Sequence, residues 1–142
     1  MIKPALGDDE FMQYFALRYR LLRQPWGEPE GSEKDDIEDQ CFHVIAKDGE
    51  SVIGVGRLQF NSAEEAQIRY MAVDTACERR GIGRQIVAAL EKHASAQGRH
   101  SMVLDAREPA VGFYRRLGYT VTGPSYLLFG EIQHYAMRKQ LR

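Results

Sequence analysis

The clearest chemical signal lies in residues 79–84, where three arginines surround Gly81 and Gly83. An apolar stretch precedes this segment, and an amphipathic pattern follows it at 83–97. Glycine lets the backbone turn tightly and approach a ligand, and the first amides of a helix have no partner inside the helix. Those amides and the helix dipole favour a phosphate group. The spacing therefore predicts a site for phosphate or pyrophosphate on the amides of residues 79–84.

Composition narrows the class of protein. The chain has 142 residues, which suits one domain, 1–142, with a core of its own. Its 44% hydrophobic and 27% charged residues are usual for a soluble domain, and a net charge of -1 gives no field that would hold nucleic acid. The apolar runs are too short to cross a bilayer, and Cys41 and Cys77 lack metal-ligand spacing. We expect a cytoplasmic protein without a nucleic-acid, membrane or metal partner.

The elements that must position this turn follow from hydrophobic periodicity. One amphipathic helix is predicted from Asp8 or Asp9, as its cap, to about Leu22, another at 83–97, and a third from Pro109. The buried stripe of the second is predicted to be Ile82, Ile86, Ala89, Leu90 and His93. Strands are predicted at 2–5, 41–47, 50–60, 66–73, 102–104, 119–122 and about 131–141. This order predicts a three-layer α/β domain, with a mixed, mostly antiparallel central sheet and helices on both faces.

Two motifs resemble those of a known superfamily. The first is Met71-Ala72-Val73-Asp74 followed by Arg79-Arg80-Gly81-Ile82-Gly83, and the second is Leu104-Asp105-Ala106-Arg107, then Ala110, then Phe113-Tyr114-Arg115-Arg116-Leu117-Gly118-Tyr119. In this order they make the chain similar to small, single-domain bacterial members of the GCN5-related N-acetyltransferase (GNAT) superfamily. The resemblance implies acetyl-CoA as co-substrate and no metal. It implies that the cofactor is bound by Met71, Ala72, Val73, Arg79, Arg80, Gly81, Ile82, Gly83 and Arg84.

The resemblance also assigns catalytic roles. In the family, the strand before the loop splays from its neighbour, which makes an amide near Met71 available to stabilise the thioester oxyanion. A tyrosine at the position of Tyr114 protonates the departing thiolate. A phenol with a pKa of ~10 remains protonated at neutral pH and can donate to a thiolate whose thiol has a pKa of ~8.5.

The general base is ambiguous. Many relatives carry a glutamate on the strand before the loop, but residues 67–70 here contain no carboxylate. The remaining candidates are Glu131 and His134, which would face opposite sides of a regular strand and could act together only across a turn or bulge. A water chain to solvent is another route, and a purely structural role for His134 is as plausible as a catalytic one.

Glu78 departs from the family pattern. The family's loop usually has glutamine or arginine three residues before the first glycine. A carboxylate facing a pyrophosphate would repel it, unless the side chain points away and the neighbouring arginines compensate. This departure favours an alternative hypothesis, in which the chain is an acyl-CoA-binding regulatory module with little catalysis.

The acceptor side is predicted from residues 24–39, which correspond to one wall of the acceptor site in the family. Seven of the twelve residues from Glu28 to Asp39 are acidic, and a short acidic helix is predicted from Ser32. Such a wall would attract a cationic amine, although a solvated acidic loop explains the same composition. The leading hypothesis is an N-acetyltransferase that acts on a small-molecule or peptidyl primary amine by direct attack in a ternary complex. A monomer and a homodimer both stay open.

Overall fold

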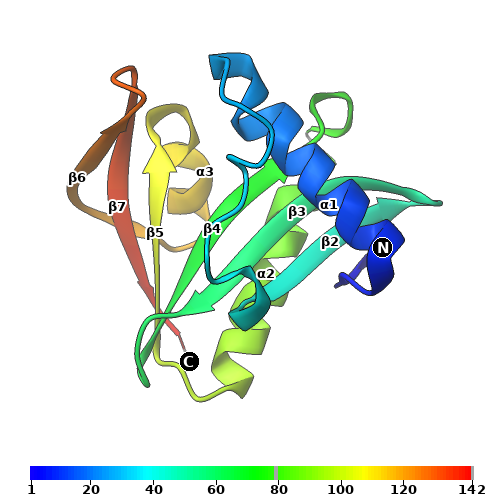
Figure 1. Ribbon diagram of the computed structural model, residues 1–142. Helices are drawn as coiled ribbons and strands as arrows, with labels where there is room; N and C mark the ends of the chain where they lie inside the picture. Colours follow the sequence, from blue (N-terminus) through cyan, green and yellow to red (C-terminus); the bar gives the residue numbers. More distant parts are fainter. Residues whose placement is uncertain (79, 142) are drawn as a thin grey trace.

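The computed structural model describes residues 1–78 and 80–141. Within these ranges, one seven-stranded sheet has the order β1-β2-β3-β4-β5-β7-β6 (Figure 1). Its strands are β1 (Ile2–Pro4), β2 (Phe42–Asp48), β3 (Ser51–Phe60), β4 (Glu65–Val73), β5 (Ser101–Arg107), β6 (Thr120–Leu128) and β7 (Ile132–Gln140). The helices are α1 (Gly7–Leu22), α2 (Ile82–Ala96) and α3 (Val111–Arg116), with the 3-10 turns η1 (Gln24–Trp26), η2 (Glu38–Gln40), η3 (Thr75–Cys77) and η4 (Glu108–Ala110).

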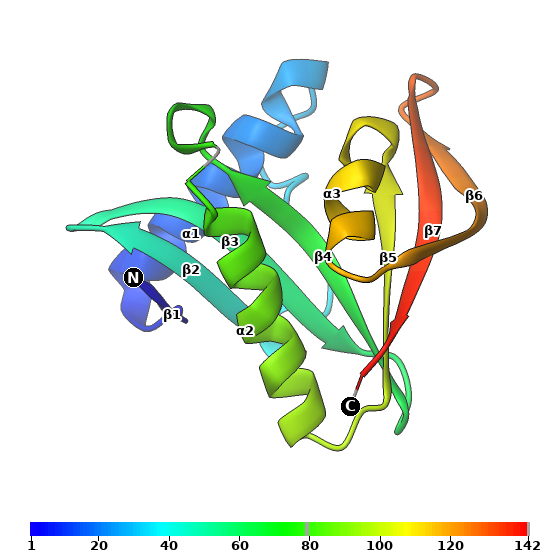
Figure 2. The ribbon, with the colours of Figure 1, turned by 180° about the vertical axis from the view of Figure 1, so that it is seen from behind.

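The predicted three-layer architecture is confirmed. Neighbouring strands are antiparallel except β4 and β5, which are parallel. Figures 1 and 2 show α1 on one face of the sheet and α2 with α3 on the other. Each face has its own apolar cluster, one containing Tyr14 and Leu17 of α1, the other containing Ile86 and Leu90 of α2. Because α1 covers only part of its face, the β5, β7 and β6 side of that face is left open.

Close packing of α2 on β3 depends on two glycines. A Cβ at Gly56 would lie 2.7 Å from Cγ2 of Ile86, and one at Gly54 would lie 2.9 Å from its Cδ1. Larger residues at these positions would push the helix away from the sheet. The buried stripe of α2 is Ile82, Ile86, Val87, Leu90 and Ala94, so Val87 and Ala94 take the places predicted for Ala89 and His93. The ring of His93 instead stacks on Phe42 at a centroid distance of 3.6 Å.

The start of α1 differs from the prediction. The helix begins at Gly7 after Leu6, and neither Asp8 nor Asp9 caps it. Glu10 reaches back instead, and its Oε1 accepts a hydrogen bond from the Leu6 amide at 2.9 Å. A carboxylate one turn inside the helix therefore satisfies the first free amide.

The acidic segment does not form the helix predicted from Ser32. It forms turns and the short η2, because its carboxylates face inward toward buried arginines. Asp35 accepts from both terminal nitrogens of Arg57, at 2.7 and 2.8 Å. Glu38 Oε2 accepts from Arg57 at 2.9 Å and from Arg18 at 2.8 Å. These contacts hold the segment against the sheet.

Candidate active site

The site forms where β4 and β5 separate (Figures 1 and 2). Their parallel pairing ends at Ile68 and Leu104. Toward β3 the register of β4 shifts by one residue, so that Tyr70 and Met71 lie opposite Gly56, and Tyr70 has a left-handed φ of 54°. Such a bulge bends a strand and interrupts its ladder. Beyond Ile68, the β5-facing edge of β4 therefore has backbone groups without a ladder partner among the described residues.

The turn after β4 is shaped by a side-chain cap and by glycines. Asp74 Oδ1 accepts a hydrogen bond from the Ala76 amide at 3.1 Å and starts η3. Gly81 has a left-handed φ of 76° and is the N-cap of α2, a conformation that costs glycine nothing. A Cβ at Gly83 would lie 3.1 Å from Cζ of Phe113, so a small residue is needed where α2 meets α3. The first amides of α2 lie at this cleft without partners inside the helix.

Two adjoining cavities line this region. The helix-side cavity has a volume of about 480 Å³, and the central cavity, between β4, β5 and the end of α1, has about 380 Å³. The two share the residues Met71, Ala72, Val73, Glu78, Ala110 and Tyr114. Of the predicted cofactor residues, those that line the helix-side cavity are Met71, Ala72, Val73, Gly81, Ile82, Gly83 and Arg84. A hollow of about 550 Å³ along α1 is larger. None of the predicted catalytic or cofactor residues lines it, but Glu30, Glu33 and Lys34 of the predicted acceptor wall do.

Not all the charged residues at the predicted turn line the two cavities. Arg79 lies outside the described residues. Arg80 is exposed and forms an ion pair with Asp48 at 3.6 Å, and it does not line either cavity. Glu78 lines both cavities, and among the described residues it is the one carboxylate that does so. Glu78, the residue that departs from the family pattern, therefore lies at the cleft itself.

Tyr114 is buried at the junction of the two cavities. Its ring packs edge-on against Phe113 and Tyr119, at centroid distances of 4.9 and 5.8 Å. Burial raises the pKa of Tyr114, because ionisation in an apolar environment is unfavourable. The phenol therefore stays protonated at neutral pH, close to the free edge of β4 at Met71.

The two candidate bases do not reach these cavities. Glu131 is exposed in the turn between β6 and β7, one residue before β7 begins. His134 is 4% exposed, and its ring stacks on Tyr126 at 4.3 Å. The His134 Nδ1 lies 3.0 Å from the Ile132 carbonyl oxygen, which can only accept, so the neutral ring carries its proton on Nδ1 and its lone pair on Nε2. Burial lowers the pKa of His134, so this neutral form predominates at pH 7.

Side chains that the sequence did not single out form a third cavity of about 190 Å³, here called the arginine-lined cavity. Arg23, Arg69 and Arg107 line it together with Tyr70 and Tyr126. It shares Leu22, Met71 and Arg107 with the central cavity. The sequence contained only a weak signal for this cavity: Arg69 and Arg107 occupy outward positions near the ends of β4 and β5, the two strands that diverge.

The surrounding residues give no sign of a metal centre or a membrane span. In residues 1–78 and 80–141, no group of three or more histidine, cysteine, aspartate or glutamate side chains could hold a metal ion. No helix within the same ranges is both apolar and long enough to cross a bilayer.

Comparisons with known proteins identify the family and the fold. The model of the "Acetyltransferase (GNAT) family" matches residues 9–119. The chain is 28% identical to "Uncharacterized N-acetyltransferase YjcF" of Bacillus subtilis (strain 168) over 135 residues, which are 95% of this chain and 96% of that protein. Its fold is similar to the crystal structure of an aminoglycoside 6'-N-acetyltransferase complexed with coenzyme A, with a TM-score of 0.82, 17% identity and coverage of 99% and 96% of the two chains. It is also similar to Escherichia coli ElaA, with a TM-score of 0.80, 16% identity and 98% coverage of both chains.

Proposed function

Because this chain belongs to the acetyltransferase (GNAT) family, we propose that it transfers the acetyl group of acetyl-CoA to a primary amine, by direct attack in a ternary complex. Membership of the family makes the protein an acyltransferase. The observation that carries the more specific proposal is that Tyr114, a buried proton donor, lines the same cavity as the free edge of β4 and the first residues of α2. The proton donor Tyr114, the free edge of β4 and the predicted anion site at the start of α2 are thus parts of one cleft.

The residues present fit coenzyme A. The left-handed Gly81 and the close contact of Gly83 with Phe113 place the first amides of α2 at the cavity wall, where a pyrophosphate would be favoured. Arg84 is exposed beside them and supplies positive charge. The interrupted edge of β4, from Met71 to Val73, has backbone groups for a pantetheine arm. Bound acetyl-CoA supplies the activated acetyl group.

Two groups of the chain would act at the thioester. The amide near Met71 would donate to the carbonyl oxygen as negative charge develops there, a contribution of about 3 kcal/mol in preorganised sites. Tyr114 would donate its proton to the sulfur as the carbon–sulfur bond breaks. Its raised pKa keeps the phenol protonated at neutral pH but makes it a weaker acid than the departing thiol. Proton transfer to the sulfur is therefore uphill by itself, and it would have to be coupled to carbon–sulfur cleavage and to loss of the proton from the attacking amine.

Three groups are candidates for the base, and two of them, His134 and Glu131, lie outside the cleft. His134 has a free Nε2 lone pair but is covered by Tyr126, so it would need a water to reach the amine. Glu78 lines the central cavity directly, and Glu131 lies at the hairpin tip. The variants His134→Gln, Glu78→Gln and Glu131→Gln separate these routes through the pH profile of kcat/KM. If His134 is the base, the acidic limb lies below pH ~6.5, since burial lowers its pKa, and His134→Gln removes that limb.

The decisive test of the transferase proposal is Tyr114→Phe. It should lower the rate of thiol release by roughly 10²- to 10⁴-fold and leave acetyl-CoA binding in calorimetry unchanged. The matched control is Tyr119→Phe, an adjacent buried tyrosine whose hydroxyl donates to Glu91 at 2.7 Å. This control should lose about 1 kcal/mol of stability and keep its turnover. Turnover within twofold of wild type in Tyr114→Phe would exclude the assigned role.

Glu78 lines both cavities, and this observation favours the second hypothesis, an acyl-CoA-binding regulatory module. A carboxylate at the cleft would weaken the binding of an anionic cofactor, and Glu78→Gln should then tighten acetyl-CoA binding by roughly two- to fivefold. Acetyl-CoA binding without thiol release for any amine would favour the module over the transferase.

A further inference from the structure

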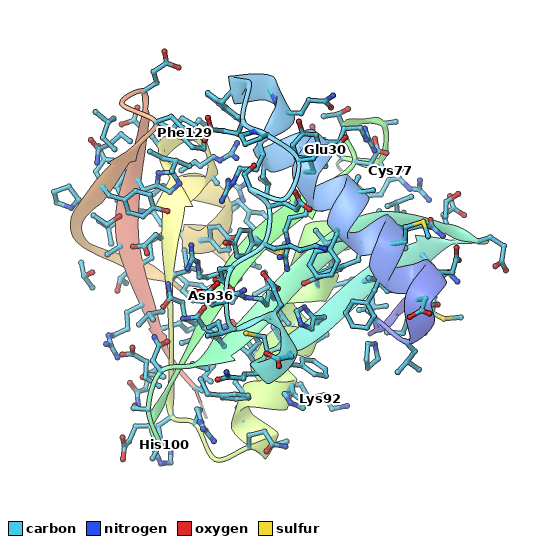
Figure 3. All side chains as sticks on the ribbon, viewed as in Figure 1. Glu30, Asp36, Cys77, Lys92, His100 and Phe129 are labelled. Carbon is cyan, nitrogen blue, oxygen red and sulfur yellow. The ribbon has the colours of Figure 1, made fainter. Side chains whose placement is uncertain are left out.

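The arginine-lined cavity lies on the far side of the central cavity from α2. Because it shares Met71 and Arg107 with the central cavity, it adjoins the predicted thioester position from the open face of the sheet. In Figure 3, Cys77 in the turn before α2 and Phe129 at the β6–β7 tip lie at the same end of the molecule, opposite His100. Tyr114 lines the central cavity and not the arginine-lined cavity, so an acceptor whose amine reaches Tyr114 would extend from the first cavity into the second.

Two of the three arginines that line this cavity, Arg107 and Arg23, form no ion pair among the described residues. Arg107 has no ion pair there, and Arg23 donates only to the carbonyl oxygens of Ser32 and Leu22, each at 3.0 Å. Arg69 lies 3.8 Å from an oxygen of Asp35, a carboxylate that already binds Arg57. The cavity is thus strongly positive.

Among the described residues, no other carboxylate forms an ion pair with these arginines, although Asp105 is close enough to add to the raised pKa of Tyr126, which is mainly due to burial. Asp105, two residues before Arg107 on β5, lines a different cavity and is not within ion-pair distance of an arginine in the described ranges. Glu33 and Glu38 of the acidic segment face the backbone amides of Gly31 and Asp35. Three of the seven acidic side chains that suggested a cationic acceptor, Glu33, Asp35 and Glu38, therefore stabilise the fold of the segment itself.

Aromatic rings hold two of these guanidinium groups in place. The Arg107 Cζ lies 4.8 Å from the centroid of Trp26, and the Arg23 Cζ lies 5.5 Å from Tyr70 and 5.7 Å from Phe129. Stacking engages the face of a guanidinium and not the N–H donors at its edge, although Nε and one terminal nitrogen of Arg23 already donate to carbonyl oxygens. Those in-plane donors match the paired oxygens of a carboxylate or phosphate.

The positive charge of Arg107 is energetically unfavourable in the protein without a ligand. Partial burial and the nearby Arg23 both lower the pKa of Arg107, because each disfavours its charged form. A fold that only needed to pack this position would use a neutral side chain. A bound oxyanion would relieve both effects.

We propose that the acceptor is an amine that also carries an oxyanion, a carboxylate or a phosphate, which Arg107 and Arg23 bind. The inference rests on the transferase function proposed above. With the oxyanion held by these arginines, the amine is directed toward Met71 and Tyr114. The small volume of the cavity, about 190 Å³, suits a small molecule.

The test measures thiol release from acetyl-CoA with matched pairs of amines that differ in one anionic group. The pairs are β-alanine with β-alaninamide, 2-aminoethyl phosphate with ethanolamine, and glucosamine 6-phosphate with glucosamine, and spermidine represents cationic amines. At least one anionic member should exceed its neutral partner roughly tenfold in kcat/KM. The first pair reports on a carboxylate, and the other two report on a phosphate.

The variants Arg107→Gln and Arg23→Gln should each lower kcat/KM for the anionic member of a pair by at least about tenfold more than for its neutral partner, and so remove this preference. The matched control is Arg99→Gln, which removes the same charge at the opposite end of the sheet, where Arg99 Nε donates to the Ser62 carbonyl. The control should keep the preference.

A second measurement uses inorganic phosphate and no acceptor, with coenzyme A saturating so that the site on α2 is filled. Phosphate should raise the melting temperature of the wild type and not that of Arg107→Gln. Without phosphate, Arg107→Gln should melt no lower than the wild type, because it loses an unpaired, partly buried charge.

The outcomes separate the two proposals. The proposal of an anionic acceptor is wrong if thiol release is as fast with neutral amines or spermidine as with anionic amines. It is also wrong if Arg107→Gln slows both members of a pair equally. Neither result contradicts the transferase proposal. Acetyl-CoA binding without thiol release for every amine contradicts the transferase, and the acceptor proposal fails with it.

Discussion

The two sides of the cleft are built in different ways. The helix-side cavity takes most of its lining from one stretch of chain, 71–84, and its recognition groups are backbone amides exposed by a bulge and by glycines. The arginine-lined cavity takes side chains from the end of α1, from β4, from β5 and from β6. The first side is therefore a product of local sequence, and the second is a product of tertiary packing.

The support beneath the two sides differs as well. The helix side rests on apolar contacts of α2 with β3, such as Ile86 against Gly56. On the acceptor side, the Tyr70 ring lies 4.1 Å from the Arg18 Cζ and 4.8 Å from the Arg57 Cζ, and both guanidinium groups are buried. Backbone recognition thus has an apolar foundation, whereas side-chain recognition is supported by a buried network of charges.

The strongest test of this contrast is Arg57→Leu. Arg57 is fully buried and binds Asp35, Glu38 and Gln59, so its loss leaves Asp35 without its main partner and Glu38 with Arg18 alone. We expect the free energy of unfolding in urea to fall by about 3 kcal/mol. Adding Asp35→Asn to Arg57→Leu should restore part of this loss, since that carboxyl is then neutral, whereas Glu38 keeps its ion pair with Arg18.

The control from the helix side is Arg84→Leu, an exposed arginine without an ion pair in the described ranges. It should change stability by less than about 0.5 kcal/mol. Equal losses in Arg57→Leu and Arg84→Leu would contradict the view that buried charges support one side only.

The sequence predicted the helix side well because its signals are local. The glycine turn, the amphipathic period of α2 and the three-layer order of elements all follow from residues close together in the chain. The start of α1 was misplaced because Glu10, one turn inside the helix, binds the Leu6 amide in place of a capping aspartate. That contact depends on how Glu10 is held by Lys47, at 3.1 Å, which no local rule contains.

The acceptor side could not be predicted in the same way. The acidic composition of residues 28–39 suggested a wall for cations, but Asp35 and Glu38 bind arginines of β3 and α1 that are distant in sequence. Arg107 and Trp26 meet only in the folded chain. Charge counted along a sequence does not reveal which charges are neutralised by partners, and that pairing decides the field in a cavity.

A second, smaller test uses Gly81→Ala. The φ of Gly81 is 76°, and a Cβ there has room, so the cost is backbone strain of about 1–2 kcal/mol. Gly98→Ala is a matched control, because Gly98 has a φ of 80° and open space at the other end of α2. Both variants should lose similar stability in thermal unfolding. Only Gly81→Ala should weaken acetyl-CoA binding, and a loss of binding in both would mean that general instability, rather than the turn, is responsible.

The smallest expected effect concerns acid pH on the acceptor side. Hydrogen bonds from Arg57 lower the pKa of Asp35 to about 2, from 3.8. The stabilisation is therefore fully present well above pH 3.8 and is lost as the pH falls toward 2. Asp35→Asn should be less stable than wild type by about 1 kcal/mol at pH 6, a value reduced for solvent screening of this partly exposed carboxyl. In urea unfolding, this difference in stability should disappear between about pH 4 and 2.

The control is Asp36→Asn, which alters the neighbouring exposed aspartate, labelled in Figure 3. It should show no such difference, because in the described ranges Asp36 has no ion-pair partner. A gap for Asp35→Asn that persists unchanged at pH 2 would mean that shape, and not charge, holds this segment against the sheet.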